Sequence, residues 1–259
     1  MLADPVLPLS GVHNFRDYGG YAVEGSGQLR EGWLWRSAHH EAATDADLAA
    51  IDALGLETVI DLRGDDERAL HPCRRSDNFA ARVLFAEGNT AGLAPHLQAA
   101  QGAIDVDTAR ARMVDTYAGM PYRPVLVATL RLYLAALAEY DAPSLVHCVA
   151  GKDRTGFAVA IVHRLLGVHE DDLMHDYLLT NSAGKIEERI AQGGAHIRAR
   201  YGREIADDAI RMLMSVNPAF LDAALATVRR DHGDVPSYAE AVLNVTPAMR
   251  EAMIDKLVV

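Results

Sequence analysis

Residues 144–156 read SLVHCVAGKDRTG, and the rest of the chain is best understood as support for this segment. Residues 144–146 are typical of the end of a short apolar strand, and a helix is expected from near Thr155 to Leu166. A chain of 259 residues is long enough to hold one large α/β domain and to bury a sizeable core.

The loop itself carries the chemistry. Five residues separate Cys148 from Arg154, and Gly151 stands in the middle. A loop that closes onto a helix N-terminus can turn backbone N–H groups toward a phosphate-sized anion and favour the thiolate form of a cysteine. Arg154 offers a planar fork of donors for two phosphate oxygens, and Thr155 can donate to the sulfur.

These residue types predict a phosphate-binding loop with a cysteine nucleophile. The predicted phosphate-binding residues are Val149, Ala150, Gly151, Lys152, Asp153, Arg154 and Thr155, and His147 is expected to orient the loop. A nucleotide-binding GxxxxGK[ST] motif fails, because Val146 replaces the first glycine and Asp153 follows the lysine. A buried structural cysteine would leave the Gly, Lys, Asp and Arg pattern unexplained, and no C-x-x-C redox pair is present.

The segment HCVAGKDRTG resembles the HCxxGxxRT signature of the Cys-dependent protein tyrosine phosphatase superfamily. GKDRTG is similar to the bacterial, mycobacterial PtpB-like branch of tyrosine and dual-specificity phosphatases. NFRD, WRSA, DLR, DYLLTN and the C-terminal residues 237–257 extend the resemblance over nearly the whole chain. It implies one phosphatase domain over residues 1–259, with a central, mostly parallel sheet flanked by helices.

The resemblance implies covalent phosphoryl transfer. Cys148 would attack phosphorus while Arg154 and the loop N–H groups hold the oxygens, and water would then hydrolyse a phosphocysteine. A general acid must protonate the leaving oxygen, and Asp153 is the first candidate, although it could instead only shape the loop. The alternative acids are Glu87, Asp105, Asp107 and Asp115.

Lys152 bears on the substrate. It adds positive charge where a second phosphate could bind, and lipid phosphatases of the superfamily carry a lysine at this position. The net charge of −11 and the lack of a membrane motif weigh against a lipid substrate. We place protein phosphotyrosine first, a phosphoinositide or dual-specificity activity second, and a non-catalytic phospho-ligand binding module last.

Polar residues elsewhere are candidates for supporting the loop. Arg63, at the end of a strand predicted over residues 56–62, either lines the pocket or pairs with Asp61. Arg16 and Asp17 either support the loop from below or pair with each other. Further along, Asp176, Tyr177 and Asn181 either close over the pocket rim or pack between helices, and His163 is expected to be a packed or surface histidine.

The remaining elements are expected as follows. Thr44 with Asp47 should cap a helix over 45–54, residues 65–70 should form a short helical turn, and a long helix should follow Pro124. Strands are expected over 32–36 and 82–86. Residues 87–122 are predicted to form a helical, lid-like insertion, and residues 168–259 a mainly helical subregion.

Composition sets the remaining expectations. Two cysteines, Cys73 and Cys148, argue against a disulfide-stapled domain, and Cys73 is interpreted as an incidental thiol. We see no signal peptide and no membrane span, so a cytoplasmic location is expected, with unconventional secretion left open. We expect no cofactor and no metal, because the histidines His13, His39, His40 and His71 form no H-x-x-x-H pair. The expected partners are a phosphorylated protein or small phosphomonoester and inorganic phosphate, but not nucleic acid or a stably bound membrane.

Overall fold

The computed structural model describes residues 5–25, 27–89, 105–184, 186–188, 190–191 and 206–259. Within them, five strands form one mixed sheet in the order β1-β2-β5-β3-β4. Their bounds are β1 Arg16–Asp17, β2 Leu34–Ser37, β3 Thr58–Asp61, β4 Arg82–Leu84 and β5 Ser144–His147. All neighbours pair in parallel except β1, which is antiparallel to β2, so the prediction of a mostly parallel sheet is confirmed.

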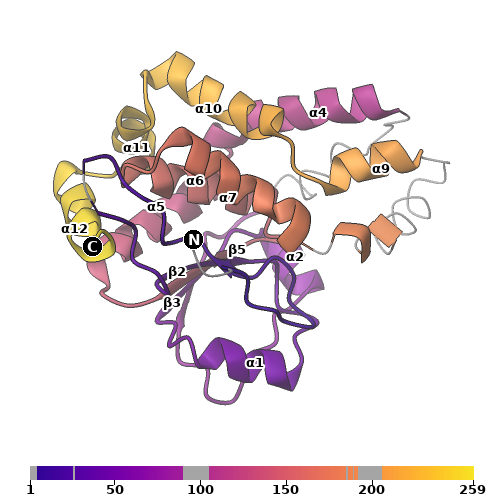
Figure 1. Ribbon diagram of the computed structural model, residues 1–259, viewed down its shortest axis with the longest axis horizontal. Helices are drawn as coiled ribbons and strands as arrows, with labels where there is room; N and C mark the ends of the chain where they lie inside the picture. Colours follow the sequence, from indigo (N-terminus) through magenta and orange to yellow (C-terminus); the bar gives the residue numbers. More distant parts are fainter. Residues whose placement is uncertain (1–4, 26, 90–104, 185, 189, 192–205) are drawn as a thin grey trace.

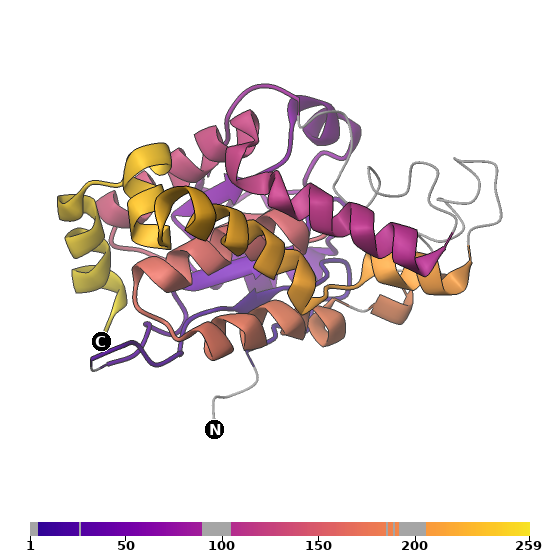
Figure 2. The ribbon, with the colours of Figure 1, turned by 90° about the horizontal axis from the view of Figure 1, so that it is seen from above.

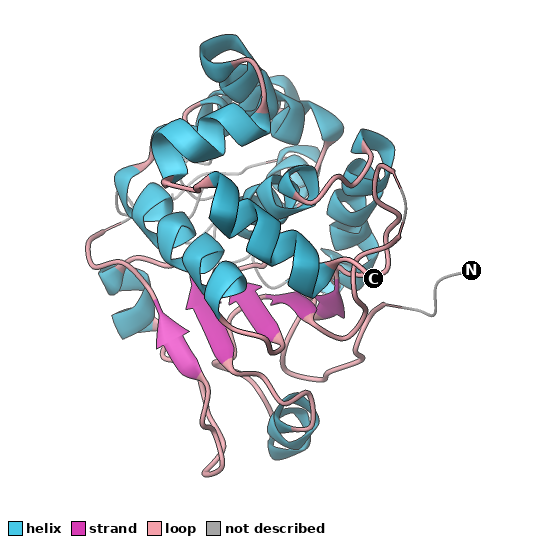
Figure 3. Ribbon diagram, turned by 90° about the vertical axis from the view of Figure 1, so that its left-hand side faces the viewer, coloured by secondary structure: helices cyan, strands magenta, loops and turns pink. Residues whose placement is uncertain are grey.

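The sheet buries both of its faces. Alternate residues of a strand point to opposite sides, and accordingly Ile60 and Val146 join the larger hydrophobic core while Val59 and Leu145 join a smaller one. Leu48 and Ile51 of helix α1 (Asp45–Asp52) cover the smaller core. Figure 3 shows α1 on one side of the sheet and most other helices on the opposite side.

Helices form the larger layer and the C-terminal part of the chain (Figure 1). After α1 they are α2 Asp65–Leu70, α4 Val106–Ala118, the 3-10 turn η1 Met120–Tyr122, α5 Pro124–Glu139, α6 Asp153–Leu165, α7 Glu170–Ala183, α9 Asp207–Met214, α10 Pro218–His232, α11 Val235–Leu243 and α12 Pro247–Leu257. The expected capping box at Thr44 and Asp47 is present, and α5 begins with Pro124.

None of the described helices could span a membrane by itself, judged by its length and apolar composition. The bent pair α9 and α10 reaches that length and composition only when the two helices are taken together.

Element boundaries differ from the expected ones by at most two residues, and α2 has the expected bounds. The most consequential difference is at α6, which begins at Asp153 rather than near Thr155. Asp153 and Arg154 therefore lie in the first helical turn, where backbone N–H groups have no partner within the helix.

The insertion expected over 87–122 is only partly described, since residues 90–104 lie outside the described residues. Its described part contains α4 and η1. Helix α4 buries Ala109, Met113 and Tyr117 and packs against α9 and α10, beside which it runs in Figure 2. A lid function for this insertion stays a prediction.

Candidate active site

Three parallel strands bring the site together at one edge of the sheet. Ser37 and Asp61, the last residues of β2 and β3, are both paired with His147, the last residue of β5. The residues that follow these strands therefore lie side by side, at the edge where α/β sheets bind ligands. Cys148 is the residue that follows β5, and its side chain is buried.

The loop 148–154 has its carbonyl groups bonded on the outside. The carbonyl of Val149 accepts from the N–H of His39, and that of Lys152 accepts from the N–H of Gly156. In contrast, the backbone N–H groups of residues 149, 150, 151 and 154 donate to no backbone carbonyl within the described ranges. A loop with this pattern can offer several N–H groups to one anion.

Gly151 makes the turn possible. Its φ is +62°, a value that side-chain-bearing residues rarely adopt. A Cβ at this position would lie 2.4 Å from the carbonyl carbon and oxygen of Ser37. The loop therefore packs directly on the end of β2, and only glycine fits there.

Arg154 is fixed by a carboxylate that the sequence analysis missed. Glu67 of α2 accepts from both of its terminal nitrogens, at 2.5 and 2.8 Å, and the carbonyl of Leu62 accepts from Nη1 at 3.1 Å. Burial alone would lower the pKa of Arg154, but the hydrogen bonds and charge of Glu67 outweigh it and raise that pKa. The Nε–H group is buried and has no partner among the described residues, so it remains able to bind an anion. The sequence signal for Glu67 is its place three residues after Gly64, whose N–H it accepts at 3.0 Å.

Asp153 is buried and receives a hydrogen bond from a tyrosine. The hydroxyl of Tyr117 donates to Oδ1 of Asp153 at 2.8 Å, and the hydroxyl of Tyr177 lies 2.8 Å from that of Tyr117. Because burial and the nearby Asp153 raise the pKa of Tyr117 well above its ordinary value, Tyr117 stays protonated and can donate. Its single hydroxyl proton is directed to Asp153, so Tyr177 donates to Tyr117.

The four alternative acids lie in different surroundings. Glu87, Asp105, Asp107 and Asp115 are all exposed to solvent. Asp105 is already used as the N-cap of α4, where it accepts from the N–H of Thr108. Of the five candidates, Asp153 alone belongs to the loop and is buried.

Lys152 is completely buried, and its ammonium group binds the end of α9. Nζ lies 2.5 Å from the carbonyl oxygen of Leu213 and 3.2 Å from that of Ser215, and 3.3 Å from Oδ1 of Asp153. Carbonyl groups at a helix C-terminus attract cations, because they lack partners within the helix and lie at the negative end of its dipole. The loop therefore carries the expected positive charge, but the Lys152 ammonium group points to the C-terminal end of α9.

Two arginines and one aspartate lie beneath the loop. Asp176 of α7 accepts from Arg16 at 3.0 Å and from Arg36 at 2.5 Å, and Arg36 also donates to the carbonyl of Gly151 at 3.0 Å. Burial alone would raise the pKa of Asp176, but the two arginines lower it, so the group is ionised. Asp17 does not pair with Arg16. It accepts instead from the backbone N–H groups of Gly19, at 2.8 Å, and Gly32.

Arg63 pairs with Asp61, one of the two arrangements left open. Its guanidinium donates to both carboxylate oxygens at 2.9 and 2.7 Å, and to Sγ of Cys73 at 3.2 Å. Asp61, Cys73 and His147 bring possible metal-ligand atoms within 4.8 Å of one another. Arg63 already donates to Asp61 and Cys73, so its guanidinium supplies a positive charge to this cluster of three residues. Cys73 and Cys148 are both free thiols.

His147 and Thr155 are both fully buried. Burial lowers the pKa of His147 to about 4, so the ring is neutral near pH 7. Its Nε2 lies 3.8 Å from the Asp61 carboxylate, which is beyond hydrogen-bond distance. The hydroxyl of Thr155 has no hydrogen-bond partner in the described part of the chain.

The other predicted helix residues connect elements. The ring of Tyr177 packs on Gly156, where a Cβ would lie 2.8 Å from the ring. Asn181 exchanges two hydrogen bonds with the backbone of Val216, at 3.0 and 2.9 Å. His163 is a packed histidine, with Nε2 2.9 Å from the carbonyl of Tyr18. These contacts hold α7 and α6 in place around the loop.

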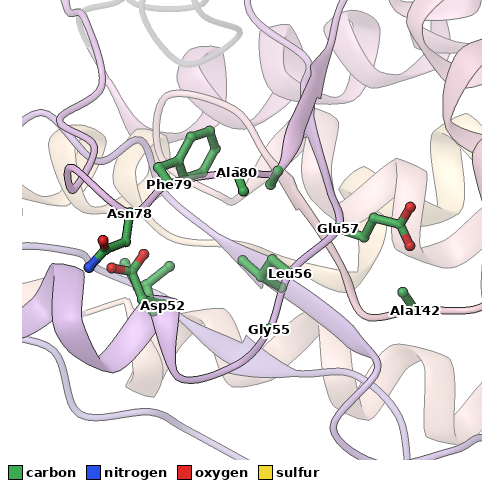
Figure 4. Close-up of a pocket in the computed structure, with 10 residues that line it drawn as sticks. Asp52, Gly55, Leu56, Glu57, Asn78, Phe79, Ala80 and Ala142 are labelled. Atoms are coloured by element: carbon green, nitrogen blue, oxygen red, sulfur yellow. The ribbon is translucent and has the colours of Figure 1, made fainter.

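A cavity of about 440 Å³ lies elsewhere in the molecule (Figure 4). Its lining comes from the end of α1 and from the segments that precede β3, β4 and β5. It therefore lies at the opposite edge of the sheet from Cys148. None of its lining residues is a cysteine, serine, threonine or histidine, so it offers no side chain suited to nucleophilic catalysis.

Cys148 and Arg154 lie at the two ends of one loop, and both are buried. Comparison with known proteins identifies the family. The family described as "Tyrosine phosphatase family" matches residues 7–259, so the chain belongs to this family and is a phosphatase. A Cupriavidus necator protein named "Putative tyrosine-protein phosphatase" is 34% identical over 250 residues, which cover 93% of this chain and 85% of that protein. The "Triple specificity protein phosphatase PtpB" of Mycobacterium tuberculosis is 30% identical over 262 residues, or 90% and 92% of the two chains.

Among solved structures, the crystal structure of P. aeruginosa TpbA is similar at a TM-score of 0.33 and 22% identity. The match covers 71% of this chain and 86% of that one.

Proposed function

We propose that the enzyme hydrolyses protein phosphotyrosine through a phosphocysteine intermediate on Cys148. The observation that carries the proposal is the loop itself. Cys148 lies buried at its start, Arg154 at its end is fixed by Glu67, and the loop carbonyls are bonded away from the N–H groups. This arrangement suits a dianionic phosphate ester whose phosphorus is next to the sulfur.

The reaction would proceed in two steps. In the first, the Cys148 thiolate attacks phosphorus, the bond from phosphorus to the tyrosine oxygen breaks, and Asp153 gives its proton to that oxygen. Arg154 and the loop N–H groups hold the three remaining oxygens. In the second, water attacks the phosphocysteine, Asp153 takes a proton from the water, and inorganic phosphate leaves as the thiolate is restored.

The test is a matched turnover panel. Phosphotyrosine peptide, phosphoserine peptide and phosphoinositides are compared at equal concentration by phosphate release, with Cys148→Ser as the blank. We expect phosphotyrosine to give the highest kcat/KM and C148S to give no turnover. Equal or faster turnover of another substrate class would overturn the assignment of phosphotyrosine, and turnover by C148S would overturn the role of Cys148.

The role of Asp153 needs a separate test, because this residue could serve only the shape of the loop. Phenolic leaving groups need little protonation, whereas alkoxide leaving groups need much. Asp153→Asn should therefore lose far more activity on an alkyl phosphate than on an aryl phosphate. Full turnover of the alkyl phosphate by D153N would exclude the acid role.

A second candidate is a dual-specificity or phosphoinositide activity. The name of the mycobacterial relative and the presence of Lys152 favour it. Against it, the Lys152 ammonium is bonded to the carbonyl groups of Leu213 and Ser215. Lys152→Met separates the two functions. If the lysine serves α9, the variant loses thermal stability and keeps its ratio of phosphoinositide to phosphotyrosine turnover, and if the lysine binds a second phosphate, that ratio falls.

A further inference from the structure

Asn14 has a backbone conformation that calls for an explanation. Its φ is +58°, and among the described non-glycine residues only Asn244, with φ +60°, shares this left-handed conformation. Asn244 is the C-cap of α11, a common use of such an asparagine. Asn14 precedes β1, is buried and ends no helix of the described residues. Strained residues of this kind occur preferentially at functional sites.

The side chain of Asn14 reaches the catalytic loop. Nδ2 donates to the carbonyl of Gly151 at 2.6 Å and lies 3.5 Å from that of Ala150. The orientation of this amide is fixed by Arg16, which donates to Oδ1. Because an arginine can only donate, the oxygen must face it and the NH₂ group must face the loop.

The backbone of Asn14 is held equally firmly. Its N–H donates to the carbonyl of Ala183 at the end of α7, at 3.0 Å. On the other side, the carbonyl of the preceding residue, His13, accepts from the N–H of Ala38 at 2.9 Å. Asn14 is therefore placed by β2 and α7 together before its side chain meets the loop.

These contacts decide which way a loop peptide faces. The Gly151 carbonyl accepts from Asn14 and also from Arg36, at 3.0 Å. Since the peptide group is planar and trans, the N–H of Lys152 points to the opposite side from that carbonyl. A flipped peptide would instead turn a carbonyl oxygen toward the bound anion and repel it.

We propose that Asn14 is a positioning residue for phosphate binding, which holds the carbonyl groups of Ala150 and Gly151 away from the anion. The N–H groups of Gly151 and Lys152 are thereby kept turned toward the phosphate. This inference rests on the proposed role of the loop as the phosphate site, and it adds a residue from the N-terminal segment to that site.

The test uses two matched glycine variants. Asn14→Gly keeps the left-handed backbone, which glycine adopts readily, and removes only the side-chain amide. Asn244→Gly makes the same change at a φ of +60°, where the side chain is exposed to solvent. The measurements are the dissociation constant for orthovanadate, the kcat and KM for p-nitrophenyl phosphate, and the melting temperature.

We expect N14G to bind vanadate at least tenfold more weakly and to show a higher KM, while N244G keeps wild-type values of both. A merely structural role of Asn14 would lower the melting temperature of N14G and leave the vanadate affinity of the folded protein unchanged. An N14G protein that is folded and binds vanadate within twofold of the wild type overturns the proposal.

A second variant covers the case in which N14G does not fold. In Asn14→Asp the added charge is compensated by Arg16, but a carboxylate oxygen replaces the NH₂ group that faces the Gly151 carbonyl. Folded N14D is expected to lose vanadate affinity at least as strongly, and wild-type affinity would reject the proposal. If the wild-type protein itself binds no vanadate, the proposed function of the loop fails, and this result is distinct from a failure at Asn14.

Discussion

The guanidinium of Arg154 and the carboxylate of Glu67 form a two-point ion pair in the protein interior, with N–O distances of 2.5 and 2.8 Å. The pair uses the two terminal nitrogens of Arg154 and leaves its Nε–H without a described partner. Glu67 thus orients the arginine before any anion arrives.

We expect Glu67→Gln to lower kcat/KM by roughly 10- to 100-fold, because Arg154 would bind the transition state in the proposed mechanism and misplacement of such a group costs about this much. The amide keeps the shape of the side chain but loses the charge that fixes Arg154. Steady-state kinetics on p-nitrophenyl phosphate measures the change. Glu57→Gln is the matched control, since it breaks a half-exposed pair with Arg82 at the far edge of the sheet. Equal activity of the two variants would show that Arg154 needs no such anchor.

Tyr117→Phe should impair protonation of the leaving group. The variant removes the hydroxyl that donates to Asp153 at 2.8 Å and leaves the ring in place. We expect turnover of an alkyl phosphate to fall about tenfold, since a positioned acid contributes 10²–10⁴-fold in total and only its orientation is weakened. Turnover of an aryl phosphate should change little. Tyr122→Phe breaks a surface hydrogen bond of the same length, to Asp231, and serves as the control. An equal loss on both substrates would indicate that Tyr117 only supports the fold.

Gly151→Ala and Gly55→Ala separate backbone strain from a steric clash. Both glycines have φ near +60°, at +62° and +63°, but a Cβ at Gly55 meets no atom within 4 Å. G55A should therefore lose only about 1–2 kcal/mol of unfolding free energy. G151A should lose roughly 1–3 kcal/mol more, because the added carbon is forced against the Ser37 carbonyl. Urea unfolding measures both, and equal losses would contradict this packing of the loop on β2.

Stability should fall as the pH drops below neutrality. Burial lowers the pKa of His147 from 6.5 to about 4, so between these values the unfolded chain binds a proton that the folded protein refuses. A shift of this size contributes up to about 3 kcal/mol of destabilisation at pH 4. His39, His40 and His163 shift in the same direction, also chiefly through burial.

Urea unfolding at several pH values between 7 and 4 measures this dependence. His147→Gln should show a smaller loss of stability over that range than the wild type. An unchanged pH dependence in H147Q would mean that folding does not change the pKa of His147.

The contiguous part of the site could be predicted, and the long-range part could not. The strand, loop and helix around Cys148 follow from thirteen adjacent residues, 144–156, whose types and spacing suit one chemistry. Glu67 and Asn14 contact the loop from 87 and 137 positions away in the sequence, and local patterns carry no information on such distances. Lys152 could be predicted only in part. Its positive charge follows from the sequence, but the direction in which its ammonium group points depends on where α9 ends.

The support of the loop comes from Asn14 and Arg16 near one end of the chain and from Asp176 and Leu213 in its second half. Contacts between segments so far apart form slowly, because a large part of the chain must first be brought together. During synthesis, the ribosome must release the polypeptide beyond residue 215 before the catalytic loop can be completed. Catalytic competence should thus be acquired late in synthesis, and a chain that ends before residue 215 should have none.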